Sequence, residues 1–394
     1  MTQIDFIPYG HQSISDDDIN AVVAALKSEY LTQGPSVTAF EQAIAKKVNS
    51  RYAVAANNAT SALHLACLAL GVGKNDRVWT SPITYIASAN CARYCGADVD
   101  FVDIDPQTYN MCAEKLADKL AKAKAEGKLP KVIIPVHFAG QSCDMEAIHQ
   151  LSKLYGFRII EDASHATGAK YQGNYVGCGA FSDICVFSFH PVKIITSAEG
   201  GMALTNDEQL AKHMKTHSQQ GITKSPDELT QLPGDWYYEQ HTLGFNYRMT
   251  ELQAALGLSQ LSRLDEFITE RHLQFTRYED LLKNFPITLP FQKDGRKSSL
   301  HLFPILLPKH HINSRKAIFD ALRQANIGTQ IHYIPVHTQP YYQALGFNSG
   351  DFPIAEDYYQ RTLSLPLYVG LTLEQQQRVA NVLRQALVDH GVFE

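Results

Sequence analysis

Residues 157–207 read FRIIEDASHATGAKYQGNYVGCGAFSDICVFSFHPVKIITSAEGGMALTND. Three apolar runs in this stretch, 157–160, 184–189 and 202–205, have the length and composition of buried strands. The first run ends in two acids, the second of which is Asp162, and the second run is followed by Lys193. Ligands of open α/β sheets bind at the carboxyl ends of the strands, so both side chains are candidates for a site.

An aspartate and a lysine in such positions suit the chemistry of one cofactor. A lysine amine that can lose its proton forms a Schiff base with a carbonyl group. Pyridoxal phosphate needs such a lysine, together with an acid that keeps its ring nitrogen protonated. From the residues alone, a buried aspartate at a strand end and a surface lysine after a loop are the stronger interpretation.

Three motifs favour the cofactor site over the purely structural interpretation: EDASHATGA (161–169), FSFHPVK (187–193) and SAEGGM (197–202). They resemble the DegT/DnrJ/EryC1/StrS sugar aminotransferases, which are fold-type I enzymes that depend on pyridoxal phosphate. The resemblance runs from YGHQSISDDD (9–18) to LSLPLYVGLT (363–372) and therefore covers nearly the whole chain. Within the family, the 4-aminotransferases of pseudaminic acid synthesis are the most similar group.

The resemblance implies an α/β fold in which a mostly parallel central sheet carries helices on both faces. Alternating strand and helix patterns through residues 50–205 predict such a sheet independently. We expect a large cofactor-binding domain (1–250), a bridging helix (251–283) and a smaller α+β C-terminal domain (284–394). Outside the opening stretch, strands are expected at 52–56, 77–79, 99–104, 132–136, 301–307 and 328–334, and a long loop at 218–240.

Two amphipathic helices are expected before the first strand. Ser15 and the acids after it predict one helix start, with Ile19, Val22, Val23 and Leu26 on one face. Ser36 is a candidate cap for the second helix, with Val37, Phe40 and Ile44 turned inward.

The turn at 57–61 joins a predicted strand to a predicted helix, and its backbone N–H groups form a possible phosphate site. A plain capping turn fits these residues equally well. The resemblance implies that Ala59, Thr60, Ser61 and Ser188 hold the cofactor phosphate, Ala59 replacing the glycine usual in the family. It adds Asn246 of the neighbouring subunit, from GFNYRM (244–249).

The resemblance also assigns the remaining site residues. Lys193 is the catalytic Schiff-base lysine, and Asp162 pairs with the ring nitrogen. Tyr85 stacks on the ring, and His165 lies beside the ring hydroxyl, although a packing role for His165 is equally compatible with the sequence. Tyr9, His332 and Tyr333 are the expected substrate contacts, although 332–342 is also compatible with a plain strand and turn.

Composition excludes several functional classes. The net charge is −5 and no block of Lys or Arg occurs, which argues against nucleic-acid binding. No apolar run approaches membrane-spanning length, and MTQIDFIPYG lacks the features of a signal peptide. Seven scattered cysteines without a CxxC pair indicate reduced thiols in a cytoplasmic protein. Sixteen histidines include no HExxH motif, so we expect no metal, and His137 is expected to be a cleft wall or a satisfied polar residue.

The expected activity is transfer of an amino group from L-glutamate to C4 of a UDP-linked 4-keto-6-deoxy-N-acetyl hexose. The expected assembly is a homodimer with shared active sites. One alternative is a C4 or C3 aminotransferase for another nucleotide-linked keto sugar, with dTDP or GDP. A PLP-dependent sugar dehydratase would carry His in place of Lys193, and a non-catalytic binding protein on this fold would not need both Asp162 and Lys193.

Overall fold

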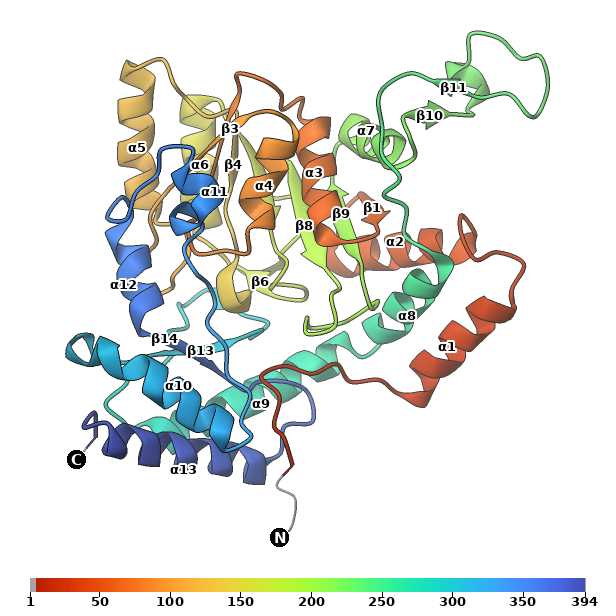
Figure 1. Ribbon diagram of the computed structural model, residues 1–394. Helices are drawn as coiled ribbons and strands as arrows, with labels where there is room; N and C mark the ends of the chain where they lie inside the picture. The colour runs from red at the N-terminus through yellow and green to blue at the C-terminus, as the bar shows by residue number, and fades with distance from the viewer. Residues whose placement is uncertain (1–4, 394) are drawn as a thin grey trace.

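The computed structural model describes residues 5–393, so residues 1–4 of the N-terminal stretch lie outside it. Its centre is a seven-stranded sheet with the order β1-β9-β8-β5-β4-β2-β3 (Figure 1). β9 is antiparallel to both of its neighbours, and the remaining pairs are parallel, which confirms the predicted mostly parallel sheet. The strands are β1 (Tyr52–Ala56), β2 (Arg77–Thr80), β3 (Asp98–Phe101), β4 (Val132–Ile134), β5 (Arg158–Asp162), β8 (Ile184–Ser188) and β9 (Gly201–Thr205).

Helices cover both faces of this sheet, and neighbouring strand residues show how. Ile160 packs in the buried cluster that contains α3 (Ala59–Ala69), α4 (Ala87–Tyr94) and α7 (Glu208–Ser218). Ile159 packs on the other face, with α5 (Ala113–Ala125) and α6 (Met145–Tyr155). Because both faces are buried, the strands are continuous apolar runs, and this made them recognisable in the sequence.

The N-terminus of helix α2 (Pro35–Val48) is capped from a distant part of the chain. The carboxylate of Glu251 accepts hydrogen bonds from the backbone nitrogens of Gly34 (3.0 Å), Ser36 (2.7 Å) and Val37 (3.3 Å). The expectation that Ser36 caps this helix is therefore wrong: the N-cap is Gly34, and no side chain of its own caps it. Phe40 and Ile44 are buried as expected, and Val37 is half-buried.

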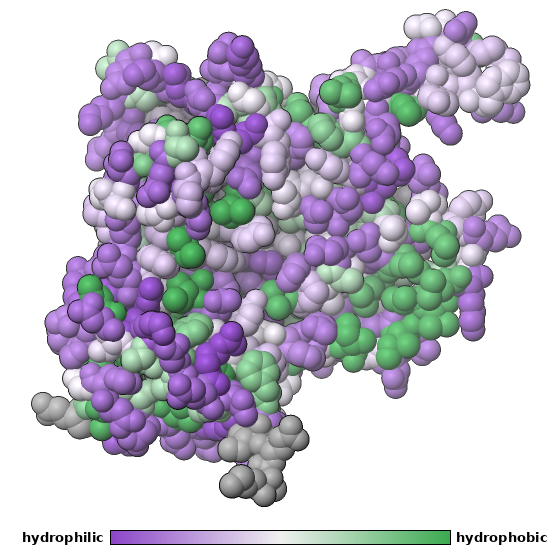
Figure 2. Space-filling view, in the orientation of Figure 1, coloured by the Kyte–Doolittle hydropathy of each residue, from purple (hydrophilic) through white to green (hydrophobic). Residues whose placement is uncertain are grey.

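Helix α1 (Asp16–Lys27) begins with a capping box between Ser15 and Asp18, as the sequence indicated. The apolar side chains on it are largely uncovered: Ile19 is 53% exposed and Leu26 is 55% exposed. Figure 2 shows a broad hydrophobic area over this part of the surface. In the single chain, this face of α1 does not belong to the core.

The predicted bridging helix is two helices, α8 (Glu251–Leu261) and α9 (Leu264–Leu282), so the expectation of one continuous helix is wrong. The break falls at Ser262 and Arg263. The Arg263 guanidinium there binds the Asp18 carboxylate and the carbonyl oxygen of Ser13, and these contacts tie the break to the start of α1.

The C-terminal part contains an antiparallel pair, β13 (Phe303–Leu306) and β14 (Thr362–Leu365). The predicted strand at 328–334 is wrong, because that segment makes a single bridge, Gln330 to Ser364. It then leaves β14 and runs towards the central sheet, where the nitrogen of Val336 donates to the carbonyl oxygen of Pro82, two residues after the end of β2. The accompanying helices are α10 (Arg315–Gln324), α11 (Pro340–Gln343), α12 (Pro353–Arg361) and α13 (Leu373–Asp389).

The predicted loop at 218–240 contains a short hairpin, β10 (Ile222–Thr223) with β11 (Glu239–Gln240), in an arm that projects from the body (Figure 1). A small sheet of β6 (Lys170–Tyr171), β7 (Asn174–Tyr175) and β12 (Arg296–Lys297) completes the strands. In the described part of the chain, 3-10 turns lie at Phe138–Gly140, Pro226–Glu228, Lys309–Ser314 and Val336–Thr338. Within residues 5–393, no helix combines the length and the apolar character that crossing a bilayer requires.

Candidate active site

A cleft of about 1150 Å³ lies at the carboxyl ends of β5 and β8, bounded on one side by residues 330–342. Most of the residues predicted from the sequence line it: Tyr9, Ala59, Thr60, Tyr85, Asp162, His165, Ser188, Lys193, His332 and Tyr333. Two predicted residues do not belong to this lining in the described chain. Ser61 is buried in the first turn of α3, and Asn246 is exposed at the base of the projecting arm.

Lys193 is half-buried in the cleft, five residues after the end of β8. Its backbone nitrogen donates to the carbonyl oxygen of His190 at 2.9 Å, which closes the turn that presents the side chain. Burial lowers the pKa of Lys193 to about 8, although the negative charge of Asp162 acts in the opposite direction. An amine with this pKa is partly neutral near physiological pH, as a nucleophile or a proton acceptor must be.

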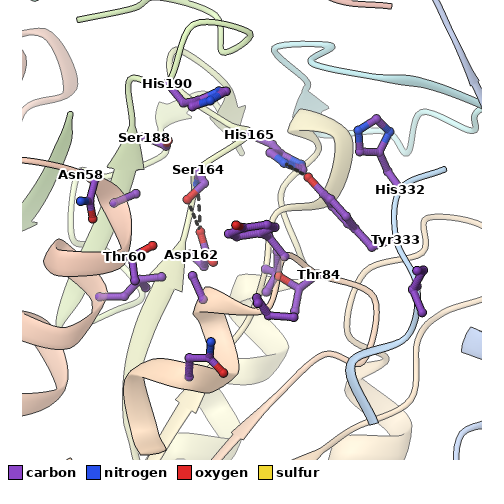
Figure 3. Close-up of a pocket in the computed structure, with 18 of the residues that line it drawn as sticks. Asn58, Thr60, Thr84, Asp162, Ser164, His165, Ser188, His190, His332 and Tyr333 are labelled. Carbon is purple, nitrogen blue, oxygen red and sulfur yellow. Dashed lines mark hydrogen bonds between the residues drawn. The ribbon is translucent and has the colours of Figure 1, made fainter. Parts of the chain in front are cut away.

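The carboxylate of Asp162 is held at the end of β5 by two serines. Ser164 donates to Oδ1 through its hydroxyl at 2.6 Å and its backbone nitrogen at 3.1 Å (Figure 3). On the other side, the hydroxyl of Ser88 lies 2.6 Å from Oδ2, and Thr84 lies 2.6 Å from Ser88. Since the carboxylate accepts, Ser88 donates to it and in turn accepts from Thr84. The three hydroxyls fix the orientation of a carboxylate that is only 4% exposed.

The first turn of α3 forms a cradle beside this carboxylate. The side chain of Asn58 caps the helix by accepting from the nitrogen of Ser61 at 2.8 Å. Gly201 on β9 makes the cradle possible, because a Cβ at this position would lie 2.5 Å from the backbone nitrogen of Ala59. With Ser188 at the end of β8, the site combines a helix N-terminus and hydroxyl donors, which suits a phosphate group.

His165 is tied to the far wall of the cleft. Its Nδ1 accepts from the backbone nitrogen of Ala139 at 3.3 Å, so Nε2 carries the proton and donates to the hydroxyl of Tyr333 at 2.9 Å. Burial, with a smaller effect of Lys193, holds the pKa of His165 well below its usual range. The ring is therefore neutral, and the Tyr333 hydroxyl keeps its own proton available to a ligand.

His332 lies next to Tyr333 in the same wall. Its Nδ1 is 2.8 Å from the hydroxyl of Ser364, and its ring packs 5.5 Å from the ring of Tyr9. Burial lowers the pKa of His332 to about 3, with a smaller effect of Lys193. These contacts bring the three predicted substrate residues Tyr9, His332 and Tyr333 together.

His137 is a satisfied polar residue, one of its two expected roles, and it does not belong to the described cleft lining. Its Nε2 lies 2.7 Å from Glu161, and its Nδ1 accepts from the nitrogen of Cys143. Since Nδ1 accepts from a backbone N–H, the proton of the neutral ring is on Nε2, which donates to the Glu161 carboxylate. Among residues 5–393, no group of His, Cys, Asp and Glu side chains has a geometry that could hold a metal ion.

Sequence reasoning missed Thr84, Ser88 and Ser164, which orient Asp162. A signal was present for two of them: Ser164 lies two residues after Asp162, and Ser88 lies three residues after Tyr85 on the predicted helix. It also missed Arg93 and Tyr341, which line the outer part of the cleft. Nothing in the sequence placed these two side chains together, because they lie 248 residues apart.

Comparisons with known proteins agree with this geometry. Residues 12–384 match the model of the DegT/DnrJ/EryC1/StrS aminotransferase family. The chain is 38% identical over 383 residues to the spore coat polysaccharide biosynthesis protein SpsC of Bacillus subtilis, with 96% of each chain covered. It is 37% identical over 380 residues to a UDP-4-amino-4,6-dideoxy-N-acetyl-beta-L-altrosamine transaminase of Campylobacter jejuni, again with 96% of each chain covered.

A solved structure is similarly close. Helicobacter pylori PseC, described as an aminotransferase involved in the biosynthesis of pseudoaminic acid, superposes with a TM-score of 0.89 at 32% identity. The match covers 98% of this chain and 100% of PseC. The predicted enzyme class, sugar aminotransferase, is thereby confirmed, and so is pyridoxal phosphate as the cofactor. The glycine-lined cradle and the Asp162–Lys193 pair fit that cofactor, and the chain belongs to the DegT/DnrJ/EryC1/StrS aminotransferase family.

Proposed function

We propose that this aminotransferase moves an amino group from L-glutamate to C4 of a UDP-linked 4-keto-6-deoxy-N-acetyl hexose. The observation that carries the transaminase chemistry is the presence of Lys193 and Asp162 in one cleft, beside the first turn of α3. The full-length similarity to the Campylobacter jejuni transaminase supports the choice of substrate. A second candidate is amination at C4 or C3 of a different nucleotide-linked keto sugar, because SpsC has a similar identity and its description names a different product, the spore coat polysaccharide.

In this proposal the cradle holds the phosphate of the cofactor, with donors from the α3 N-terminus, Thr60 and Ser188. Ser61 contributes through the helix turn that it shares with Thr60. Asp162, oriented by its serines, faces the ring nitrogen, and Tyr85 covers the ring. Tyr85 is suited to that role because it lines the cleft while 60% of it remains exposed.

The cofactor, when bound, supplies an electron sink for the carbon from which a proton is taken. Lys193 would move that proton between the alpha carbon of the donor and the aldehyde carbon of the cofactor, which the amino nitrogen of the donor separates. Its pKa of about 8 leaves about a quarter of the amine neutral at pH 7.5, against about 0.1% at the usual pKa. His165 is neutral and therefore adds no positive charge to the cleft beside Lys193. It positions the Tyr333 hydroxyl towards the substrate side of the cleft.

We propose further that the active form is a homodimer. The uncovered side chains Ile19, Val23, Leu26, Tyr30 and Leu31 form an apolar surface on and just after α1 that a second copy would cover (Figure 2). A two-fold interface there would carry the exposed Asn246 towards the cradle of the other subunit. Seven free cysteines are compatible with a cytoplasmic location, which we also propose.

The decisive experiment is a product assay with L-glutamate and a panel of UDP-, dTDP- and GDP-linked 4-keto sugars. We expect fastest amination of the UDP-linked N-acetyl sugar, with the L-altro ketone preferred over the D-xylo epimer. Such discrimination is large where a buried polar group would lose its partner. Faster turnover of a dTDP or GDP sugar would refute this substrate and favour the second candidate, and absence of amination of every sugar would refute both.

A further inference from the structure

The outer half of the cleft has no role in the chemistry described so far. On one side it is formed by α4, which contributes Asn90, Arg93 and Tyr94, and on the other side by Tyr341 of α11. Arg93 and Lys193 are the arginine and lysine side chains among the described residues that line the cleft. Lys193 is used in catalysis, so Arg93 is the cationic side chain of this lining to which no role has yet been assigned.

The distance along α4 shows which part of a substrate Arg93 can reach. Tyr85 covers the cofactor ring in the proposed arrangement and lies two residues before Ala87, the first residue of α4. Arg93 lies six positions after Ala87, and at the rise of an α-helix this separation is about 9 Å. L-Glutamate, the proposed donor, has five carbons, so with its alpha carbon at Lys193 it is too short to reach Arg93. An acceptor that reacts at C4 carries its diphosphate on C1, across the sugar ring, so its charged part extends outward.

The contacts of Arg93 leave part of the guanidinium available. Nη1 donates to the carbonyl oxygen of Ala97 at 2.6 Å and to Asp98 at 3.2 Å. Nε donates to the hydroxyl of Tyr341 at 3.4 Å. Within the part of the chain that the structure describes, Nη2 has no hydrogen-bond partner. Arg93 is 24% exposed and Asp98 is 70% exposed, so this ion pair is open to solvent and contributes little.

We propose that Arg93 binds the diphosphate of the nucleotide-linked acceptor, and that Tyr341 positions its guanidinium. This inference rests on the proposed function and adds the residue that selects a nucleotide-linked sugar over a free one. The planar guanidinium matches phosphate oxygens better than an ammonium group does. The adjacent residue Tyr342 donates to the side-chain oxygen of Asn90 at 2.6 Å. This second hydrogen bond between α11 and α4 stabilises the position of the helix that carries Arg93.

The test measures binding of UDP and of uridine to the cofactor-loaded enzyme by calorimetry, for the wild type, Arg93→Gln, Arg93→Lys and Tyr341→Phe. We expect Arg93→Gln to weaken UDP binding about 10- to 100-fold, the effect of a lost hydrogen bond to a charged group. Uridine binding should change little. Arg93→Lys should retain part of the UDP affinity, and Tyr341→Phe should raise KM for the acceptor without lowering kcat. Arg277→Gln on α9 is the matched control, outside the cleft.

The reaction with L-glutamate alone, followed by the change in cofactor absorbance, separates this inference from the proposed function. We expect Arg93→Gln to react with L-glutamate at the wild-type rate. Unchanged UDP affinity in Arg93→Gln would overturn the inference, and so would an equal loss of the glutamate reaction, which would assign Arg93 to the donor carboxylate. A wild-type enzyme that does not react with L-glutamate would overturn the proposed donor, while UDP binding would still decide the role of Arg93.

Discussion

Replacing Gly201 with alanine tests the contact between β9 and the cradle directly. The added Cβ would lie 2.5 Å from the nitrogen of Ala59 and 2.5 Å from the carbonyl carbon and oxygen of Asn58. All three are backbone atoms, so no rotation of a side chain can relieve the clash. Either the strand or the first turn of α3 must move before the alanine fits.

The expected cost follows from this geometry. Insertion of an extra methyl group into a packed site costs about 1–3 kcal/mol when the backbone has to shift. In the cofactor-free protein, the first turn of α3 can move away from the alanine, and this movement relieves part of the strain. When the phosphate of the cofactor binds, the turn has to return to its original position, and the strain then weakens binding. The loss of unfolding free energy and the loss of binding free energy should therefore add up to about 1–3 kcal/mol. If the whole cost appeared as lost binding free energy, the Kd for pyridoxal phosphate would rise by about 5- to 150-fold.

Two measurements give the two parts: denaturant unfolding of the cofactor-free protein, and titration with pyridoxal phosphate followed by absorbance. Gly73→Ala is the matched control, because no heavy atom lies within 4 Å of a Cβ built there. The control should match the wild type in both measurements. If Gly201→Ala also matched the wild type in both, the close approach of β9 to α3 would be wrong, and with it our explanation of the glycine at position 201.

Three further predictions concern the catalytic groups. Lys193→Ala should lose the visible absorbance of the cofactor-loaded protein and its turnover, and a band that borohydride still fixes to the protein would contradict the role of Lys193. Asp162→Asn should lower the pKa of Lys193 below about 8, since Asp162 raises it, and should lose most turnover; titration of the amine in the cofactor-free protein and a rate assay measure the two effects. A mixture of Lys193→Ala and Asn246→Ala proteins should regain part of the activity that each lacks, whereas a fully active monomer in a sedimentation experiment would refute shared sites.

Much of the sheet could be predicted because its strands are buried on both faces. Runs such as 157–160 and 184–189 contain almost no polar residue, and β5 and β8 were found there within a few positions. Local signals were equally reliable at the start of α1, where a serine and acids form the capping box. These features depend on residues that are close in the sequence.

The errors arose where a distant residue decides the local structure. Ser36 has the chemistry of a helix cap, but Glu251 occupies the donors of that turn from the start of α8. Residues 328–334 have the composition of a strand, but the segment pairs once with Ser364 and then crosses to Pro82, beside the central sheet. Ser88, which orients Asp162, was missed for the same reason, because 74 residues separate the two in the sequence.

The apolar residues of α1 show what a sequence pattern can and cannot specify. The spacing of Ile19, Val23 and Leu26 correctly predicted a helix with one apolar face, but the pattern does not say which surface covers that face. In the single chain these side chains stay 53%, 38% and 55% exposed, so the helix forms without its expected partner. Asn246 has a similar relation to the active site, since it was predicted for the cradle of the neighbouring subunit and is exposed outside the cleft of its own chain. In the proposed dimer, a second copy of the chain would cover α1 and would receive Asn246, and for this reason we treat the two features together.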